Sequence, residues 1–219
     1  MYETMCLEDT GDLKNRIKTI IDSTSDTLPE KKGLYIGVPG GRSVSHIISA
    51  MMLLDDALLI RIYLVIVDER LRGEKNIDTI MDAGIQRLIE EGRFLAEHVI
   101  STQQANTSLD LVFLGVGEDG HVASLFPGSF PSLAGDDTSV ITTINDSPKP
   151  PSERRTITYQ GFSKLSPAAR YILLFLGEAK KDALKRFIAG ESPTSLPSAF
   201  FRDTMGSVTI ITDIREVES

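Results

Sequence analysis

Three continuous apolar runs constrain the fold of this chain more than any other feature. They are IYLVIV (62–67), LVFLGV (111–116), which lies within the expected strand LDLVFLGVG (109–117), and YILLFLG (171–177). A strand with one face in water alternates between apolar and polar residues, whereas an uninterrupted run of branched and aromatic residues is typical of a strand buried on both faces. Such strands occur in parallel sheets whose two faces are covered by helices. The rest of the chain therefore has to supply those helices.

Segments with helical spacing of apolar residues lie between these runs. The expected helices are 11–22, 43–54, 77–92 and 178–190, and the further expected strands are 33–38, 139–144, 155–159 and 207–212. We interpret 68–76, DERLRGEKN, as a loop. Buried strands that alternate with helices predict an α/β fold with a mainly parallel sheet flanked by helices.

The composition narrows the classes of function. With 219 residues the chain is long enough for a substantial core. Its net charge of −8 argues against nucleic-acid binding, which depends on Lys and Arg contacts to phosphates. Cys6 is the only cysteine, so an intrachain disulfide and a cysteine-based zinc site are excluded.

The N-terminus has acids where a signal peptide has basic residues, and no apolar run approaches the roughly 18 residues of a membrane span. We expect a cytoplasmic protein with no membrane partner.

Glycines and charged residues follow four of the predicted strands. The segments are PGGRS (39–43), DER (68–70), GEDGHVAS (117–124) and GEAKK (177–181). In an open parallel sheet, ligands bind outside the carboxyl ends of the strands, which lie along one edge. We therefore expect these four loops to converge on one site.

The first of these segments is suited to an anion. Gly40 and Gly41, just before a helix start, leave backbone N–H groups free to point at a phosphate, and the helix dipole favours negative charge there. Arg42 and Ser43 add a guanidinium and a hydroxyl. A tight strand-to-helix turn without a ligand explains this segment alone equally well.

The second segment places Arg70 beside two carboxylates. A guanidinium offers a planar fork of donors that suits phosphate. Asp68 and Glu69 are placed to orient Arg70 or a substrate hydroxyl. A solvated charged loop is the alternative.

The third segment contains His121, one of three histidines in the chain. A histidine titrates near neutral pH and is the usual general base. Asp119 is placed to fix its tautomer or to bind a hydroxyl, and Gly120 lets a ligand approach the backbone. The alternative is a surface histidine in a turn, and the pattern favours the functional interpretation.

Two more segments carry positive charge. NDSPKPPSERR (145–155) contains three prolines that stiffen it, together with Lys149, Arg154 and Arg155. It is either a clamp over an anion or a plain crossover, and the sequence does not choose between the two arginines. Lys180 lies in the first turn of a predicted helix, where the dipole disfavours a cation. A bound phosphate would compensate for this, although a solvated helix face is the commoner explanation.

Together these segments resemble the 6-phosphogluconolactonase family, within the wider group that includes glucosamine-6-phosphate deaminase/isomerase. The resemblance runs from about Gly33 to the end and is most specific in VDER (67–70), GVGEDGHVASLFPG (115–128) and DSPKPPSERRTITY (146–159). The turn PGGRSV matches more loosely. The segment after DER is shorter than in the family, and Asn76 is the candidate for the asparagine that ends it there.

The resemblance implies hydrolysis of 6-phospho-D-glucono-1,5-lactone to 6-phosphogluconate in the oxidative pentose phosphate pathway, with no metal and no organic cofactor. It also implies a Rossmann-like sheet with a small appended portion. We expect residues 1–219 to form a single catalytic domain. The expected partner is a small-molecule sugar-phosphate lactone, and the expected assembly is a monomer or a weak homo-oligomer.

The chemistry of the residues agrees with that reaction. A lactone is an activated ester, so a base that activates water suffices, and His121 is the candidate. Backbone N–H groups near the glycine turn, or a nearby cation, would stabilise the oxyanion. Asp68 and Asp119 are expected to bind hydroxyls or hold His121. Arg70 and Lys180 are the first choices for the phosphate. The expected substrate-binding residues are Gly40, Gly41, Arg42, Ser43, Glu69, Arg70, Gly120, Lys149, Arg154 and Lys180.

Two other functions stay open. In a sugar-phosphate deaminase or isomerase of the same group, a glutamate stands five residues after the loop histidine, where this chain has Phe126. A non-catalytic sugar-phosphate sensor with this fold usually carries a helix-turn-helix segment, and the roughly thirty residues before Gly33 are too few and too acidic for one. Both features favour the lactonase.

Overall fold

The structure is a computed structural model that describes residues 2–7 and 10–215. Its largest element is a seven-stranded sheet in which all neighbouring strands run parallel. In spatial order the strands are β1 (Tyr2–Cys6), β10 (Ser207–Thr212), β9 (Arg170–Phe175), β6 (Leu111–Gly115), β2 (Leu34–Val38), β3 (Ile62–Ile66) and β5 (Val99–Ile100). The expected parallel α/β architecture is confirmed.

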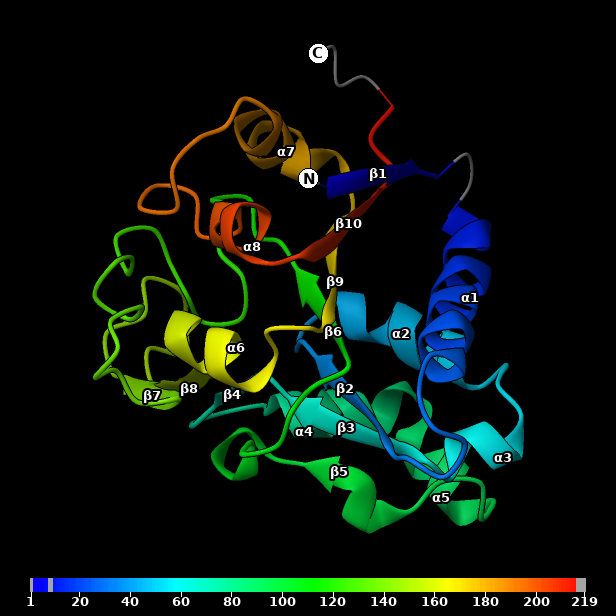
Figure 1. The fold of residues 1–219 in the computed structure, drawn as a ribbon. Helices are drawn as coiled ribbons and strands as arrows, with labels where there is room; N and C mark the ends of the chain where they lie inside the picture. Colours follow the sequence, from blue (N-terminus) through cyan, green and yellow to red (C-terminus); the bar gives the residue numbers. More distant parts are fainter. Residues whose placement is uncertain (1, 8–9, 216–219) are drawn as a thin grey trace.

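Helices cover both faces of this sheet (Figure 1). One face carries α1 (Leu13–Asp26) and α2 (Ser43–Met51), and the other carries α6 (Tyr159–Leu165), α7 (Lys181–Ile188) and α8 (Ala199–Thr204). The remaining α-helices are α3 (Asp56–Leu59), α4 (Asn76–Ile80) and α5 (Gln86–Glu90). A π-helical segment, Met81–Ile85, joins α4 to α5. Short 3₁₀ turns span Thr10–Asp12, Ala96–His98, Thr102–Gln104 and Glu178–Lys180.

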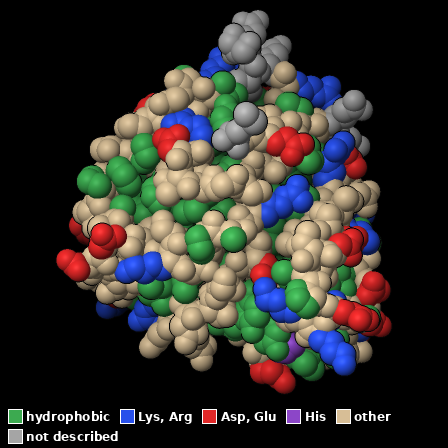
Figure 2. Space-filling model, in the orientation of Figure 1, with side chains coloured by type: hydrophobic (Ala, Val, Ile, Leu, Met, Phe, Trp, Pro, Cys, Tyr) green, Lys and Arg blue, Asp and Glu red, His purple; other side chains and the backbone are tan. Residues whose placement is uncertain are grey.

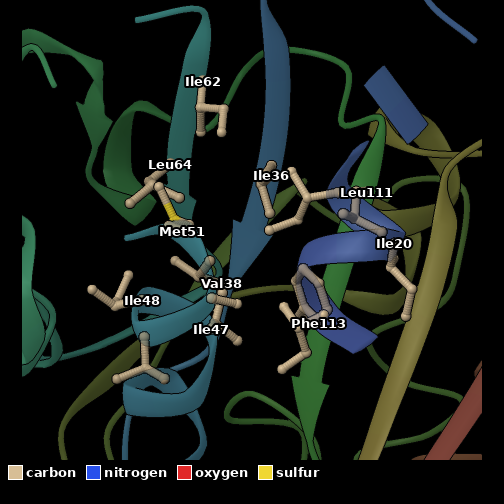
Figure 3. Close-up of a cluster of buried hydrophobic side chains, with 14 of the residues drawn as sticks. Ile20, Ile36, Val38, Ile47, Ile48, Met51, Ile62, Leu64, Leu111 and Phe113 are labelled. Atoms are coloured by element: carbon tan, nitrogen blue, oxygen red, sulfur yellow. The ribbon is translucent and has the colours of Figure 1, made fainter. Parts of the chain in front are cut away.

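The strand β6 shows how one sheet separates two hydrophobic cores. Leu111 and Phe113 point to the side of α1 and α2, into the first core cluster, which Figure 3 shows in close-up. Val112 and Leu114 point to the side of α6, α7 and α8, into the second core cluster. All four side chains are fully buried. Burial of one such side chain stabilises the fold by about 1.5–3 kcal/mol, which explains why the run contains no polar residue.

A second, smaller sheet is attached to the large one, as the expected small appended portion. It is antiparallel, in the order β4 (Asp68–Arg70), β8 (Arg154–Ile157) and β7 (Ile141–Ile144). The interpretation of 68–76 as a loop is therefore wrong for its first three residues. The sequence did not indicate this strand, because charged residues occupy both of its faces and no apolar residue alternates with them. Asp68 and Arg70 lie on one face and Glu69 lies on the other.

The surface agrees with a chain of mixed charge. Figure 2 shows acidic and basic side chains interspersed over the face it presents. Among the helices of the described residues, none is both long and apolar enough to cross a membrane.

Candidate active site

A cavity of about 260 Å³ lies at the carboxyl ends of β2, β3 and β6, beside the small sheet. Three of the four segments expected to converge contribute to its wall, and the proline-rich segment 145–155 closes it. The lining residues are Pro39, Gly40, Gly41, Asp68, Arg70, Asn76, Gly115, His121, Ala123, Lys149, Pro150 and Arg154. His121, in the loop after β6, and Arg70, on β4, therefore share one cavity.

The glycine turn after β2 is tightly packed against its neighbours. A side chain at Gly40 would collide with the carboxamide of Asn76, and Gly41 has a φ of +71°, which favours glycine. Asn76 is itself held by its Nδ2, which donates to the carbonyl of Asp68 at 2.8 Å. The hydroxyl of Ser43 comes close to Gly115, where an added Cβ would lie 2.8 Å from Ser43 Oγ. The turn thus forms part of the cavity wall through Gly40 and Gly41, and the backbone of Gly40 is hydrogen-bonded to the carboxyl group of Asp68.

Arg42 takes a different place from these residues. It is the N-cap of α2, without a side-chain capping bond, and it is exposed. It lies outside the cavity lining.

The strand β4 divides its three charged side chains by the alternation of a β-strand. Asp68 and Arg70 face the cavity. Glu69 faces the start of α4, where its carboxylate accepts the backbone N–H groups of Arg70, Asn76 and Ile77 at 2.7, 2.6 and 3.1 Å. These bonds give Glu69 a structural place, which supports the loop that carries Asn76.

Arg70 offers donors toward the cavity. Its Nη1 donates to the carbonyl of Glu74 at the long distance of 3.4 Å. Its Nε is buried and, within the described part of the chain, has no hydrogen-bond partner. A buried donor without a partner costs roughly 1–3 kcal/mol.

Asp68 is part of the cavity wall, with only 4% of its surface exposed. Its Oδ2 accepts the hydroxyl of Ser124 at 2.8 Å. Burial raises the pKa of Asp68, and the hydrogen bond from Ser124 and the charges of Arg154 and His121 oppose that rise without cancelling it. Asp68 is therefore a carboxyl group whose ionised form the site disfavours.

His121 forms a tight group with Asp119 and Lys149. The imidazole Nδ1 lies 2.5 Å from Asp119 Oδ1, and Lys149 Nζ lies 3.2 Å from the same oxygen and 3.3 Å from Nδ1. Burial works against ionisation of Asp119, but the hydrogen bonds and charges of His121 and Lys149 outweigh it and hold the pKa of that carboxyl well below its usual range. A side chain at Gly117 would collide with the imidazole, so this glycine is needed to seat it.

The proline-rich segment is held in place by Arg154. Its Nε donates to the carbonyl of Pro151 at 3.1 Å, and its Nη2 donates to those of Pro150 and Lys149 at 3.0 and 3.3 Å. The guanidinium is largely buried, and burial lowers the pKa of Arg154, whereas the charge of Asp68 raises it. Arg155 points away and donates to Gln103 at 2.8 Å. The structure thus separates the two arginines that the sequence could not.

Two other expected site residues lie beside the cavity. Lys180 is half-buried at the start of α7. Burial lowers the pKa of Lys180, the charge of Glu118 opposes this, and the charges of Lys149 and Arg42 add to it, so each of these charges lies within electrostatic reach of Lys180. Gly120 has a φ of +82° and packs against Leu196. Over the described residues, no three histidine, cysteine or carboxylate side chains form a group that could hold a metal ion.

Ser124 and Thr156 escaped sequence reasoning, and so did the contacts of Phe126, which the sequence marked only by its position five residues after His121. Ser124, Thr156 and Phe126 lie behind the cavity: Ser124 N–H donates to Thr156 Oγ1 at 3.3 Å, and the ring of Phe126 contacts both His121 and Arg154. In the sequence, hydroxyl residues and a phenylalanine within an apolar pattern cannot be distinguished from ordinary core residues. Their burial next to charged groups is a property of the fold.

Comparison with known proteins places the chain in a family. Residues 82–210 match the model of the glucosamine-6-phosphate isomerases/6-phosphogluconolactonase family. The chain belongs to this family. A 6-phosphogluconolactonase of Rattus norvegicus is 38% identical over 99 residues, which are 45% of this chain and 36% of that protein. A protein of Arabidopsis thaliana named 6-phosphogluconolactonase 3, chloroplastic, is 38% identical over 96 residues, which are 41% of this chain and 28% of that protein. The match thus covers about a third of the length of such relatives.

Solved structures in the 6-phosphogluconolactonase branch of this family have the same fold. The 6-phosphogluconolactonase of Leishmania guyanensis superposes with a TM-score of 0.78 at 19% identity, over 97% of this chain and 96% of that one. The Thermotoga maritima 6-phosphogluconolactonase superposes with a TM-score of 0.72 at 21% identity, over 97% of this chain and all of that one. The Rossmann-like architecture with its appended sheet is therefore the family fold.

Proposed function

We propose that this chain hydrolyses 6-phospho-D-glucono-1,5-lactone to 6-phosphogluconate in the oxidative pentose phosphate pathway. The observation that carries the proposal is the pairing of His121 with Asp119 in the same cavity as Arg70 and Arg154. A base next to two guanidiniums suits a substrate that joins a reactive carbonyl to a phosphate. Membership of the family and the names of the matched relatives support the same reaction.

His121 acts as the general base in this proposal. With its proton on Nδ1 and donated to Asp119, the imidazole keeps the Nε2 lone pair for water. Nε2 takes a proton as the water oxygen bonds to the lactone carbonyl carbon. The ring C–O bond then breaks, and the imidazolium returns the proton to the leaving ring oxygen. Such assistance typically contributes about 10²–10⁴ in rate.

The anionic groups of the substrate and of the tetrahedral intermediate need donors. Arg70, Lys149 and Arg154 line the cavity, and Lys180 lies within electrostatic reach of Lys149, so these side chains supply positive charge on a chain with a net charge of −8. The N–H groups of the glycine turn add donors without charge. We assign Glu69 to the support of α4 and not to the substrate, because three backbone N–H groups occupy its carboxylate.

The direct test uses freshly generated lactone. A glucose-6-phosphate dehydrogenase produces the lactone, a 6-phosphogluconate dehydrogenase reports the product, and the spontaneous hydrolysis rate is subtracted. We expect the wild-type chain to exceed the spontaneous rate, and His121→Gln to lower kcat by about 10²–10⁴. Far-UV circular dichroism (CD) of His121→Gln checks that the variant is folded. A wild-type rate equal to the spontaneous one would refute the proposed function.

A parallel assay addresses the related reaction of the family. Ammonia release from glucosamine-6-phosphate is measured with the same preparations, and we expect none. The proposed compartment is the cytoplasm and the proposed assembly a monomer or weak homo-oligomer; a fluorescent fusion and sedimentation velocity test these two points.

A further inference from the structure

Phe126 lies between the imidazole of His121 and the guanidinium of Arg154. Its ring stacks on the imidazole of His121, with centroids 4.9 Å apart and planes 29° from parallel. The guanidinium carbon of Arg154 lies 5.7 Å from the centroid of the same ring. Only 6% of Phe126 is exposed, so the ring is fixed in the wall. One phenyl ring therefore contacts both the proposed base and a proposed anion-binding group.

The backbone around Phe126 is held by local hydrogen bonds. Val122 and Leu125 form an isolated bridge just before it, with Leu125 N–H donating to the Val122 carbonyl at 2.9 Å. After it, the N–H and the hydroxyl of Ser129 donate to the Phe126 carbonyl at 3.0 and 2.6 Å. The ring thus starts from a fixed Cα position.

The hydrogen bonds of His121 and Arg154 leave each side chain free to tilt, and the phenyl ring of Phe126 restricts this tilt. Asp119 accepts the backbone N–H of His121 at 3.4 Å, but it holds the imidazole ring only through Nδ1, which allows the ring to tilt about that bond. Backbone carbonyls hold the edge of the Arg154 guanidinium but not its face. The phenyl ring stacks on the imidazole plane and so limits the tilt of His121, and the guanidinium carbon of Arg154 contacts the same ring.

If the ring of Phe126 no longer restrains the imidazole, the hydrogen bonds of Asp119 are expected to change. Its Oδ1 is shared by the imidazole Nδ1 and by Lys149 Nζ. An imidazole that tilts away leaves this oxygen to the lysine. The base would then lose both its orientation and the acceptor that fixes its tautomer.

We propose that Phe126 is a positioning residue that sets the planes of His121 and Arg154 together. The proposal rests on the proposed function for its effect on rate. The geometric part does not depend on it.

The geometric part is tested by NMR of the imidazole in the wild-type chain. The chain has three histidines, so the loss of one set of ring signals in His121→Gln assigns His121. A stacked phenyl ring shifts the ring protons of His121 upfield, and the two-bond ¹H–¹⁵N pattern identifies the proton on Nδ1. We expect both signatures in the wild type. Unshifted His121 ring protons in the wild type would overturn the proposal, whatever the variants do.

The variants separate positioning from mere stability. Phe126→Leu keeps apolar volume but has no flat face, so we expect the upfield shift to disappear and the Nδ1–H pattern to weaken. We expect kcat to fall about tenfold to a hundredfold, as for a small displacement of a catalytic group. Phe126→Tyr restores a flat ring and is expected to restore the shift and most of kcat. Phe126→Met repeats the test if the leucine variant does not fold.

Phe130→Leu is the matched control. Phe130 is in the same loop, but its ring contacts Tyr159 and Phe200, at centroid distances of 5.5 and 6.0 Å. We expect it to lower thermal stability without moving the His121 signals or kcat. If Phe130→Leu and Phe126→Leu change the His121 signals equally, the positioning role is wrong. If the wild type has no lactonase activity, the proposed function fails while the NMR comparison still decides the role of Phe126.

Discussion

Asp68 and Asp119 are two carboxyl groups of one site under opposite electrostatic conditions. Burial dominates at Asp68 and raises its pKa, whereas the hydrogen bonds and charges of His121 and Lys149 overcome burial at Asp119 and lower its pKa. The two therefore affect stability in opposite ways. Below its unfolded-state pKa, Asp68 is protonated in both states and does not lower the stability of the fold. As the pH rises from that value toward the folded-state pKa, the fold loses stability because the buried carboxyl resists ionisation.

Asp68→Asn should for this reason stabilise the fold near neutral pH. The amide removes the charge that burial disfavours, and its oxygen still accepts the hydroxyl of Ser124. We expect a higher melting temperature than the wild type at pH 7, with the difference shrinking as the pH falls toward the unfolded-state value of 3.8. Differential scanning fluorimetry from pH 4 to 8 measures it.

Asp119→Asn is the control with the opposite sign. Ionised Asp119 is stabilised by its neighbours, so its contribution is present above the unfolded-state pKa and is lost as the pH falls through the folded-state value. The amide should lower the melting temperature at pH 7. A lower melting temperature for Asp68→Asn at pH 7 would contradict the assignment of burial as the dominant effect there.

At this scale the sequence predicted the chemically unusual residues and missed their supports. His121 and Asp119 stand out because they lie beside glycines just after a buried strand, and Arg70 stands out because it follows another such strand beside two carboxylates. Phe126 and Ser124 have no such signal, because their role comes from what the fold brings next to them.

Among the larger elements, the segment 191–198 supports the loop of His121. The N–H of Ser198 donates to the Gly120 carbonyl at 3.0 Å, and the N–H of Gly128 donates to the Thr194 carbonyl at 2.7 Å. Leu196 packs where a side chain on Gly120 would lie. Two segments far apart in the sequence are thus fitted together at one glycine.

Gly120→Ala tests that fit, with Gly190→Ala as its matched control. Both glycines have a φ of +82°, so each alanine pays a backbone cost of about 1 kcal/mol or more. Only at Gly120 does the new methyl also meet Leu196; at Gly190 the space is open. We expect chemical denaturation to show a larger loss of stability for Gly120→Ala, and lactone hydrolysis to fall in that variant alone. Equal losses at the two positions would mean that the packing against Leu196 is unimportant.

Strands could be predicted from the sequence where burial alone determines their pattern of apolar residues. The runs that became β3, β6 and β9 are apolar because both faces are buried. By contrast β1 (YETMC) lies at the sheet edge with mixed exposure, and β5 has two residues, so neither produces a pattern. The strand β4 was not predicted because its side chains are charged on both faces, so the sequence shows no alternation of apolar and polar residues.

At the scale of the whole molecule, the parallel sheet explains why scattered motifs form one site. All seven strands point the same way, so the loops after β2, β3 and β6 end at one edge. The sequence predicted this convergence from the alternation of strands and helices alone. It could not predict the strand order or the attachment of the small sheet, because these depend on contacts between residues distant in the chain.

The same sheet joins the two core clusters into one cooperative unit, since neighbouring residues of β6 belong to different clusters. Phe113→Ala empties space in the first cluster and Leu114→Ala in the second, at an expected cost of about 3–5 and 2–5 kcal/mol. The chain has no tryptophan, and Tyr159 and Tyr171 are buried in the second cluster, so near-UV CD of tyrosine reports that side, whereas far-UV CD reports both. If the sheet transmits the loss, Phe113→Ala shifts the urea midpoint of both signals equally, as does Leu114→Ala. A tyrosine transition that stays at its wild-type midpoint in Phe113→Ala, while the far-UV transition moves, would show that the two faces unfold separately.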